Sequence, residues 1–341
     1  MSKKISIAID AMGGDNSPDK IIEGVKIFLD ENKTQNDFEL NIFGKEVEIK
    51  NKLTKYNIKS KHINIINSNT VVSDEESPMK AVKNSKNTSM WNCIQHQLEG
   101  KSDISLSAGN TGVLLVISRM ILKMMNEVSK PALAGLWPNK NGMNVVLDLG
   151  ANIECNDQNL IDFAELGSAL LKSLFPKEKP KVSLLNVGSE EMKGTEMLKS
   201  ASKKLKILSN EDNFIYKGYI EGNNIMSGDS NVIVTDGFTG NIALKTAEGT
   251  AKFITNNLKN NLTKLSLIFS YFSLKKFKDK LDPRKYNGAI FLGLNGPVVK
   301  SHGGIDSIGF YHSINLCYKI VKGNLMSEIK KNLNHSKSVQ E

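Results

Sequence analysis

Cysteine is scarce in this chain of 341 residues. The three cysteines, Cys93, Cys155 and Cys317, lie far apart and form no CxxC pair, which argues against a disulfide framework and a zinc site. Long apolar runs are also missing, and none approaches the roughly 20 residues that a membrane-spanning helix needs. The apolar run 5–9 is short and ends at Asp10, so it predicts a first strand and no signal peptide. We therefore expect a cytoplasmic protein.

Several nucleotide and hydrolase motifs are absent. The sequence contains no GxGxxG and no GxxxxGK(S/T), and Gly100-Lys101-Ser102 lacks the upstream glycine of the second motif. It contains no GxSxG nucleophile elbow either. These absences argue against an ordinary ATPase and against a hydrolase that uses a serine triad.

The overall charge is positive. A net charge of +9 favours acidic partners, namely nucleic acid, anionic lipid or an acidic protein. The excess comes from lysines scattered along the chain, which weakens this inference. Hydrophobic residues make up 40% and aromatic residues 6%, a composition typical of globular proteins and not of disordered ones.

Strand-like apolar segments alternate with helical segments along the chain. The expected strands are 4–10, 38–43, 62–67, 103–107, 144–149, 181–187, 232–234 and 289–294. This alternation predicts a three-layer α/β/α protein with a doubly wound, mostly parallel sheet. No long linker divides the sequence, so we expect one catalytic domain over 1–331, followed by a frayed tail at 332–341.

Five of the expected strands end in glycine accompanied by Asn, Thr, Asp or Ser. These turns are Gly13-Gly14-Asp15, Gly109-Asn110-Thr111-Gly112, Gly150-Ala151-Asn152, Gly188-Ser189-Glu190 and 237–241. In a parallel sheet the carboxyl ends of the strands share one edge, so we expect the turns to converge on a single crevice. Backbone N–H groups at such turns bind anions. One such turn alone is more simply an ordinary strand-to-helix connection, but five favour a binding crevice.

Seven motifs, in order along nearly the whole chain, resemble those of the bacterial phosphate acyltransferase family called PlsX. They are IDAMGGD at 9–15, SAGNTG at 107–112, LDLGAN at 147–152, NVGSEEMKG at 186–194, TDGFTGN at 235–241, YNGA at 286–289 and KSHG at 300–303. Departures from the family pattern are small: Asn231 stands where the family often has Asp, and Val113 where Ala is frequent.

The resemblance implies a fold similar to phosphotransacetylases and isocitrate-type dehydrogenases. It implies transfer of a long-chain fatty acyl group from acyl carrier protein (acyl-ACP) to inorganic phosphate, which yields acyl phosphate for phospholipid synthesis. It further implies a homodimer, peripheral association with the inner face of the cell membrane, no metal or organic cofactor, and no nucleic-acid partner. Two rivals remain: a phosphotransacetylase acting on short acyl-CoA, and a non-catalytic anion-binding regulator of the same fold.

The chemistry of this reaction suits a site without a triad. Phosphate is largely dianionic at neutral pH, by analogy with a second phosphate-ester pKa of about 6, and is already a nucleophile. The leaving thiolate, with a pKa of about 8.5, needs little protonation. Such a site must mainly position the reactants and stabilise the carbonyl oxyanion.

Four residues are the candidate catalytic groups. Lys193 is the first choice for a charge on phosphate or oxyanion, and its alternative is a surface lysine. Asn241 is a candidate amide donor to the thioester oxygen or, alternatively, a helix cap. Asp236 either orients a neighbour or fixes an Asx turn. His302 is a candidate for proton transfer, although a histidine in a turn is more often structural.

The expected substrate- and phosphate-binding residues come from the strand-end turns. They are Asp10, Gly13, Gly14, Asp15, Ser107, Gly109, Asn110, Thr111, Gly112, Asn152, Gly188, Glu190, Gly237, Thr239, Gly240 and Asn287.

Residues 257–285 combine an apolar stripe with many lysines. The pattern predicts a basic amphipathic helical hairpin, with Leu265, Phe269, Phe272, Lys275 and Lys276 as contact residues. Two interpretations stay open and are compatible: a packed core or dimer interface, and a hairpin that lies on anionic membrane.

Overall fold

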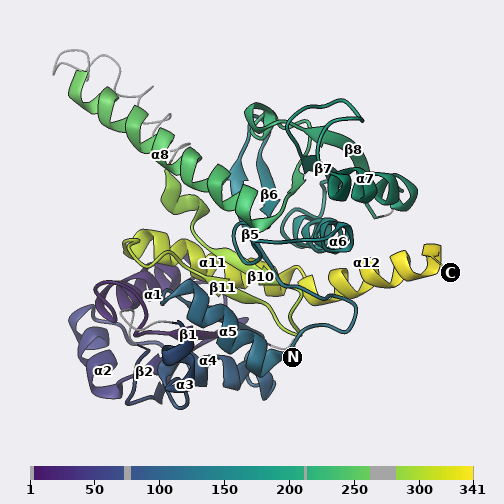
Figure 1. Cartoon of the computed structure of the whole chain (residues 1–341). Helices are drawn as coiled ribbons and strands as arrows, with labels where there is room; N and C mark the ends of the chain where they lie inside the picture. Colours follow the sequence, from purple (N-terminus) through teal and green to yellow (C-terminus); the bar gives the residue numbers. More distant parts are fainter. Residues whose placement is uncertain (1–3, 73–77, 211–212, 262–281, 341) are drawn as a thin grey trace.

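The computed structural model describes residues 4–72, 78–210, 213–261 and 282–340 (Figure 1). Within these ranges the chain forms an 11-stranded sheet in the order β3-β2-β1-β4-β11-β10-β5-β6-β9-β7-β8. The strands are β1 (Ile5–Asp10), β2 (Phe38–Gly44), β3 (Ile63–Asn67), β4 (Ile104–Ser107), β5 (Ala132–Pro138), β6 (Met143–Leu147), β7 (Lys181–Leu185), β8 (Ile215–Ile220), β9 (Val232–Val234), β10 (Ala289–Leu292) and β11 (Val298–Lys300). Each of the eight expected strands is present, with boundaries moved by a few residues at most.

Helices flank the sheet on both faces. They are α1 (Asp19–Glu31), α2 (Glu46–Lys55), α3 (Pro78–Lys83), α4 (Ser89–Leu98), α5 (Thr111–Leu122), α6 (Asp157–Leu174), α7 (Glu196–Leu208), α8 (Gly237–Asn261), α11 (Ser307–Lys322) and α12 (Leu325–Gln340), with 3₁₀ turns η1 (Gly222–Asn224) and η2 (Pro283–Tyr286). No helix of the described part is long and apolar enough to cross a bilayer.

Alternate residues of the central strands point to opposite faces of the sheet, where they join two separate cores. In β9, Val232 and Val234 join the core packed under α1, α6, α11 and α12, while Ile233 joins the core under α3, α4, α5 and α8. A strand buried on both faces reads as a continuous apolar run, because neither face meets water. The predicted three-layer arrangement follows from this burial.

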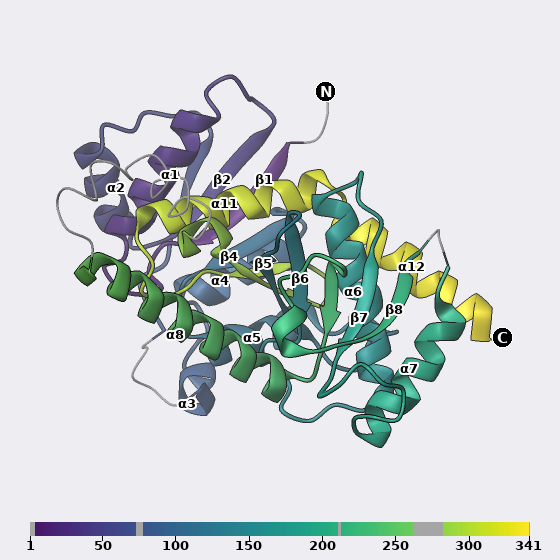
Figure 2. The ribbon, with the colours of Figure 1, turned by 90° about the horizontal axis from the view of Figure 1, so that it is seen from above.

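The sheet reverses direction in its middle. Strands β3, β2, β1, β4 and β11 are mutually parallel, and so are β6, β9, β7 and β8. Between these blocks, β10 pairs antiparallel with both β11 and β5, and β5 pairs antiparallel with β6. Three antiparallel steps make the two blocks run in opposite directions, and Figure 2 shows the two halves side by side. The prediction that all five turns lie at one edge of the sheet is therefore wrong.

Three strands, β5, β8 and β11, were not predicted from the sequence. β5 has the mixed sequence ALAGLWP, and β8 interrupts its apolar residues with Lys217 and Gly218, so neither shows a clear period of two. β11 has only three residues and follows Pro297. These three segments form strands because they pair with neighbouring strands that are distant in the sequence, and local β-propensity does not reveal such pairing.

Two further predicted segments are the C-terminal tail, 332–341, and the basic hairpin, 257–285. Helix α12 runs through Gln340, and Asn332 and Leu333 are buried, so the segment expected to be a frayed tail begins within this helix. The packing of α12 on α6 holds the start of that tail in a helix. Residues 262–281 of the predicted hairpin, including Leu265, Phe269, Phe272, Lys275 and Lys276, lie outside the described residues.

Candidate active site

Three neighbouring parallel strands bring Asp10, Ser107 and Lys300 into register at their carboxyl ends. Lys300 pairs with Ser107 across β11 and β4, and Ile9 pairs with Leu106 one residue earlier across β1 and β4. The Ser107 hydroxyl donates to Asp10 Oδ2 at 2.7 Å and accepts from the N–H of Gly109 at 3.1 Å. Asp10, Ser107 and Lys300 are each at least nine-tenths buried, so a charged, hydrogen-bonded floor lies under this edge of the sheet.

Two buried lysines reach the turns above this floor. Lys20 donates from its ammonium group to the carbonyl of Gly303. Lys300 donates to the carbonyls of Ser301 and, at 3.5 Å, Ala108. A cavity of about 640 Å³ opens beside the 303–304 turn, with Lys20 and Gly304 in its lining. The lining also includes Lys52 and the acidic residues Asp19, Glu23 and Asp306, so the positive charge available to an anionic ligand is that of the two buried lysines and not of the cavity as a whole.

Glycine is required where the turns after β1 and β4 touch. A Cβ on Gly13 would lie 2.5 Å from the backbone nitrogen of Gly109, so only glycine permits this approach. Gly14 has φ of +79°, a conformation that L side chains rarely adopt. The N–H of Asp15 donates to the carbonyl of Gly303 at 3.0 Å, which joins the third turn to the first two.

Helix α5 begins at this cluster. Asn110 caps it by accepting from the N–H of Val113 at 3.1 Å. Thr111 and Gly112, at the start of the helix, donate no backbone N–H to any residue that the structure describes. Free N–H groups and the positive end of the helix dipole favour an anion at this point.

Asn287 shapes the turn that carries His302. Its amide nitrogen donates to Ser301 Oγ, to the carbonyl of Gly309 and to Ser313 Oγ, and its Oδ1 accepts from the N–H of His302 at 3.1 Å. These bonds are all internal, so Asn287 holds the turn and its predicted role in binding substrate stays a prediction.

His302 is exposed and held by its own turn. The N–H of Gly304 donates to His302 Nδ1 at 3.1 Å, which places the proton of the neutral ring on Nε2. Burial of part of the ring, followed by the charge of Lys300, lowers the pKa of His302 below its ordinary value. Its imidazole is therefore neutral at pH 7. The Nε2–H can donate a hydrogen bond, whereas Nδ1 can accept a proton only if the hydrogen bond from Gly304 breaks.

The second half of the sheet has its own cluster of turns, built around Asp148. This fully buried carboxylate accepts from the N–H groups of Leu133, Gly150, Ala151 and Asn152 at 2.8–3.1 Å. Asn152 also donates its side-chain amide to Asp148, at 2.7 Å. Burial raises the pKa of Asp148, and these donors oppose the rise. Asp148 thus organises the turn. The side-chain amide of Asn152, which was predicted to bind substrate, donates instead to Asp148 and to the carbonyl of Pro131.

Helix α8 starts in the same cluster and is capped by Asp236. Asp236 accepts from the N–H of Thr239 and from its hydroxyl, both at 2.8 Å. The N–H of Gly237 donates to the carbonyl of Asn152, and that of Gly240 to the carbonyl of Asp236. Three of the first four N–H groups of α8 are thus satisfied internally, so the anion site predicted at this helix start is largely occupied by the protein itself. The geometry matches the Asx-turn alternative for Asp236.

Lys193 and Asn241 remain open to a ligand. Both are exposed, and neither side chain has a hydrogen-bond or ion-pair partner among the residues that the structure describes. Asn241 lies one turn inside α8, against Gly150, so its alternative role as the helix cap is wrong. The side chains of Glu190 and Lys193 fold over Gly188, where a Cβ would lie 2.7 Å from Glu190 Oε2.

The two clusters divide the predicted site residues between them. The first contains Asp10, Gly13, Gly14, Asp15, Ser107, Gly109, Asn110, Thr111, Gly112, Asn287 and His302, and the second contains Asn152, Gly188, Glu190, Lys193, Asp236, Gly237, Thr239, Gly240 and Asn241. Helix α8 links them, because its Lys245 and Glu248 both act electrostatically on His302. Figure 1 shows α8 leaving the body of the protein beside β6.

Three buried residues of the clusters were not predicted. Nothing in the local sequence around Lys20 or Asp148 indicated that these side chains would be buried in a site. Lys300 could have been predicted, because a lysine that ends an apolar strand just before a glycine turn is unusual. Within the described part, no group of three or more His, Cys, Asp and Glu side chains is placed to hold a metal ion.

Solved structures with the same architecture include EutD phosphotransacetylase from Staphylococcus aureus, with a TM-score of 0.61 at 16% identity over 94% of each chain. A 4-hydroxythreonine-4-phosphate dehydrogenase from Klebsiella pneumoniae has a TM-score of 0.54 at 12% identity, over 93% of this chain and 99% of that one. At such identities the likeness concerns the fold alone, and it confirms the predicted fold class.

Sequence comparison reaches further. A relative from Pelagibacter ubique (strain HTCC1062), named "Phosphate acyltransferase", is 55% identical over 338 residues, covering 98% of this chain and 100% of the relative. Residues 5–328 match the family described as "Fatty acid synthesis protein". Since that match spans nearly the whole chain, including both clusters of turns, the chain belongs to the fatty acid synthesis protein family.

Proposed function

We propose that this protein is an acyltransferase that moves a long-chain fatty acyl group from acyl-ACP to inorganic phosphate and releases acyl phosphate. The observation that carries the proposal is the first cluster of turns. There two buried lysines, Lys20 and Lys300, donate to the carbonyls of Gly303, Ser301 and Ala108, and the N–H groups of Thr111 and Gly112 at the start of α5 donate to no residue that the structure describes. This is an anion site without a nucleophilic triad, in a chain whose 55% identical relative is named phosphate acyltransferase.

Phosphate binds at the first cluster. The N–H groups of Thr111 and Gly112 donate to its oxygens, and the two lysines offset its negative charge. A bound phosphate dianion needs no base to become a nucleophile, which agrees with the neutral state of His302 at pH 7. His302 then serves to orient phosphate or to donate a hydrogen bond from its Nε2–H to the departing sulfur, which leaves as the thiolate.

The acyl donor binds at the second cluster. Lys193 and Asn241 are cationic and amide donors without internal partners in the described part, as stabilisation of a carbonyl oxyanion requires. The attack forms a bond between a phosphate oxygen and the carbonyl carbon, and the carbon–sulfur bond then breaks to release the carrier-protein thiolate. Helix α8 begins in this cluster, and the charges of its Lys245 and Glu248 act on His302, which supports the placement of the two substrates near one another.

The carrier protein, the membrane and a second protomer complete the proposal. A net charge of +9 favours association with an acidic carrier protein and with an anionic membrane surface. Segment 257–285 is the part of the sequence that suits membrane contact, dimerisation or both. Peripheral binding at the membrane would deliver an apolar product where it is used.

The deciding experiment mixes purified protein with phosphate and long-chain acyl-ACP and measures acyl phosphate. Formation of acyl phosphate from acyl-ACP is the expected result. Product from acetyl-CoA, but not from acyl-ACP, would instead identify a phosphotransacetylase. Binding of phosphate without turnover of either thioester would identify a regulator.

A further inference from the structure

Arginine is used twice in this chain, at positions 119 and 284, among 45 lysines and arginines in total. Lysine therefore serves almost every surface that needs a positive charge. Arginine differs by its planar fork of five donors, which binds two carboxylates in fixed directions, whereas lysine acts as a point charge. An arginine that contacts carboxylates through this fork is therefore suited to a place where the direction of the contact matters.

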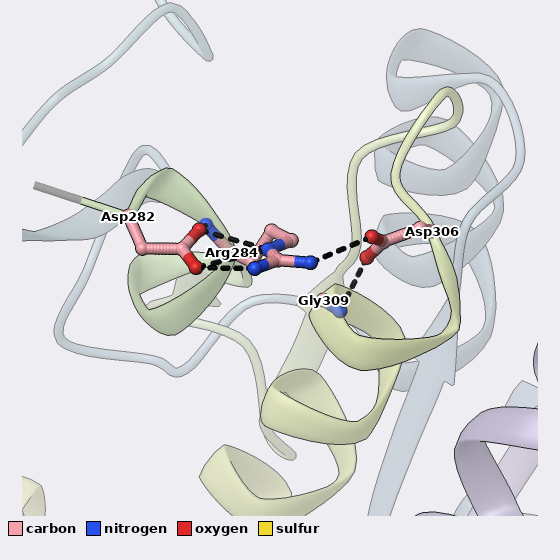
Figure 3. A network of polar contacts seen from close by, with 4 residues as sticks. All are labelled: Asp282, Arg284, Asp306 and Gly309. Carbon is pink, nitrogen blue, oxygen red and sulfur yellow. Dashed lines mark hydrogen bonds and ion pairs between the residues drawn. The ribbon is translucent and has the colours of Figure 1, made fainter. Parts of the chain in front are cut away.

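Arg284 joins two carboxylates from separate segments (Figure 3). Its Nη2 donates to Asp282 Oδ2 at 2.6 Å and its Nε donates to Asp282 Oδ1 at 2.9 Å, which makes a two-pronged contact. Its Nη1 donates to Asp306 Oδ2 at 3.0 Å. These carboxylates raise the pKa of the Arg284 guanidinium, and Arg284 lowers the pKa of Asp282.

Asp306 is also the cap of α11. Its Oδ1 accepts from the N–H of Gly309 at 2.9 Å while Oδ2 accepts from Arg284, so one carboxylate joins the guanidinium to the start of the helix. The helix start follows directly on the 301–304 turn, whose Gly303 carbonyl accepts from Lys20 and from the N–H of Asp15.

The turn is thus held at both ends by one short segment. Asn287 holds its beginning, through the N–H of His302 and the hydroxyl of Ser301. Arg284 holds its end, through Asp306. Between these two anchors lie Gly303 and Gly304, two glycines whose backbone would otherwise move freely.

We propose that Arg284 is a positioning residue for the phosphate site, which fixes the 302–306 loop through Asp306 so that Gly303 meets Lys20 and Asp15 in the binding geometry. This rests on the proposed binding of phosphate at the first cluster. The side chains of Arg284 and Asp306 are 32% and 51% exposed, so the ion pair adds little to global stability. Its effect falls on placement, where a shift of about 1 Å far from the reacting atoms costs up to about 100-fold in rate.

The test compares Arg284→Gln, Arg284→Lys and Asp306→Asn with the wild type. Asp306→Asn keeps a good helix cap but loses the negative charge, which isolates the contact with Arg284. Arg119→Gln is the matched control, since Arg119 is exposed on α5 and has no side-chain partner among the described residues. Phosphate binding is read from the thermal stabilisation that phosphate produces without any acyl donor, and the Michaelis constants for phosphate and acyl-ACP are measured alongside.

We expect Arg284→Gln and Asp306→Asn each to weaken phosphate binding about three- to tenfold. Phosphate binding by Arg284→Lys should fall between these variants and the wild type. The double variant with Arg284→Gln and Asp306→Asn should bind phosphate no more weakly than either single variant, because both changes break the same contact. The Michaelis constant for acyl-ACP should stay within about twofold in each. Unchanged phosphate stabilisation in Arg284→Gln and Asp306→Asn, or an equal loss in Arg119→Gln, would overturn the proposal. Weakened phosphate binding in a protein that turns over no thioester would uphold the positioning role and overturn the proposed function.

Discussion

Gly240 packs directly against the backbone of Asp148, so that a Cβ at position 240 would lie 1.9 Å from the Asp148 carbonyl oxygen. The first turn of α8 therefore rests on the turn that follows β6. Asp148 itself is fully buried and accepts five hydrogen bonds, so the backbone beneath Gly240 has little freedom to retreat. The position of Asn241, the next residue, depends on this contact.

Gly240→Ala should consequently displace the start of α8. We expect the free energy of unfolding to fall by about 1–3 kcal/mol, the usual cost of overpacking, and the rate to fall more than about tenfold as Asn241 moves. Gly249→Ala is the control in the same helix, because a Cβ there meets no atom within 4 Å. The control should gain up to about 1 kcal/mol from helix propensity and keep its rate. Urea unfolding and turnover measure both, and equal effects at the two positions would contradict the packing argument.

Lys193→Ala and Asn241→Ala should each lower the rate by at least about tenfold, since loss of one oxyanion donor costs about 10²–10³ in known enzymes. Both side chains are exposed and have no partner in the described structure, so the melting temperature should hardly change. Lys203→Ala, which changes an exposed lysine of α7 outside the two clusters, is the control and should leave the rate intact. Near-normal turnover in both variants would remove them from the mechanism.

Stability should depend on pH through a buried pair of carboxyl groups on α6. Burial raises the pKa of Glu165 to about 8 and that of Asp162 to about 6, and Asp162 adds to the rise at Glu165. Because the unfolded chain ionises near the ordinary pKa of 4.5, Glu165 contributes stability that is complete below that pH. That contribution is lost as pH rises towards 8. Glu165 Oε1 also has no hydrogen-bond partner among the described residues.

Glu165→Gln removes this titration, so its stability relative to the wild type should increase between pH 5 and pH 8.5. Urea midpoints at the two pH values measure the change. Glu196→Gln, whose side chain in the native protein is 91% exposed, should differ from the wild type by the same small amount at both. A constant difference for Glu165→Gln would mean that the carboxyl group is charged in the folded protein.

Association with acyl-ACP should weaken with salt. The chain carries a net charge of +9 and carrier protein is acidic, so screening raises the Michaelis constant for acyl-ACP as ionic strength increases to about 0.5 M. An acyl-pantetheine thioester, which lacks the protein, should show a much smaller change. The same salt response for both donors would contradict electrostatic docking.

Vesicles that contain anionic lipid should bind the protein, and salt should weaken the binding. An acyl phosphate with a long chain is unfavourable in water by about 0.8 kcal/mol per methylene, so delivery at a membrane avoids that cost. Phe269→Glu or Phe272→Glu should weaken binding without loss of turnover in solution, because the described clusters come from other segments. Neutral vesicles are the control. Dissociation or unfolding of these variants, with no vesicle binding to lose, would instead identify a packed interface.

The sequence determined the local structure and the residues at the strand ends. Apolar runs such as 144–149 and 181–187 predicted strands because burial on both faces requires continuous apolar side chains. Glycines 13, 14 and 109 marked places where backbones approach closely or turn left-handed, a demand that few other residues meet. These signals depend on neighbours in the chain, and the family resemblance extended them to an activity.

Only the tertiary structure decided how those pieces meet. The direction of each strand is set by long-range pairing, and the antiparallel β5 and β10 split the expected single row of turns into two clusters. Nor does a lysine-rich sequence indicate which lysines become buried. Lys20 and Lys300 are 280 positions apart, yet both are buried and both donate to carbonyls of the turn that follows β11. Asp236, not Asn241, caps α8, because the cap is chosen by where the backbone leaves the sheet. Pairing and burial join residues that local sequence cannot relate.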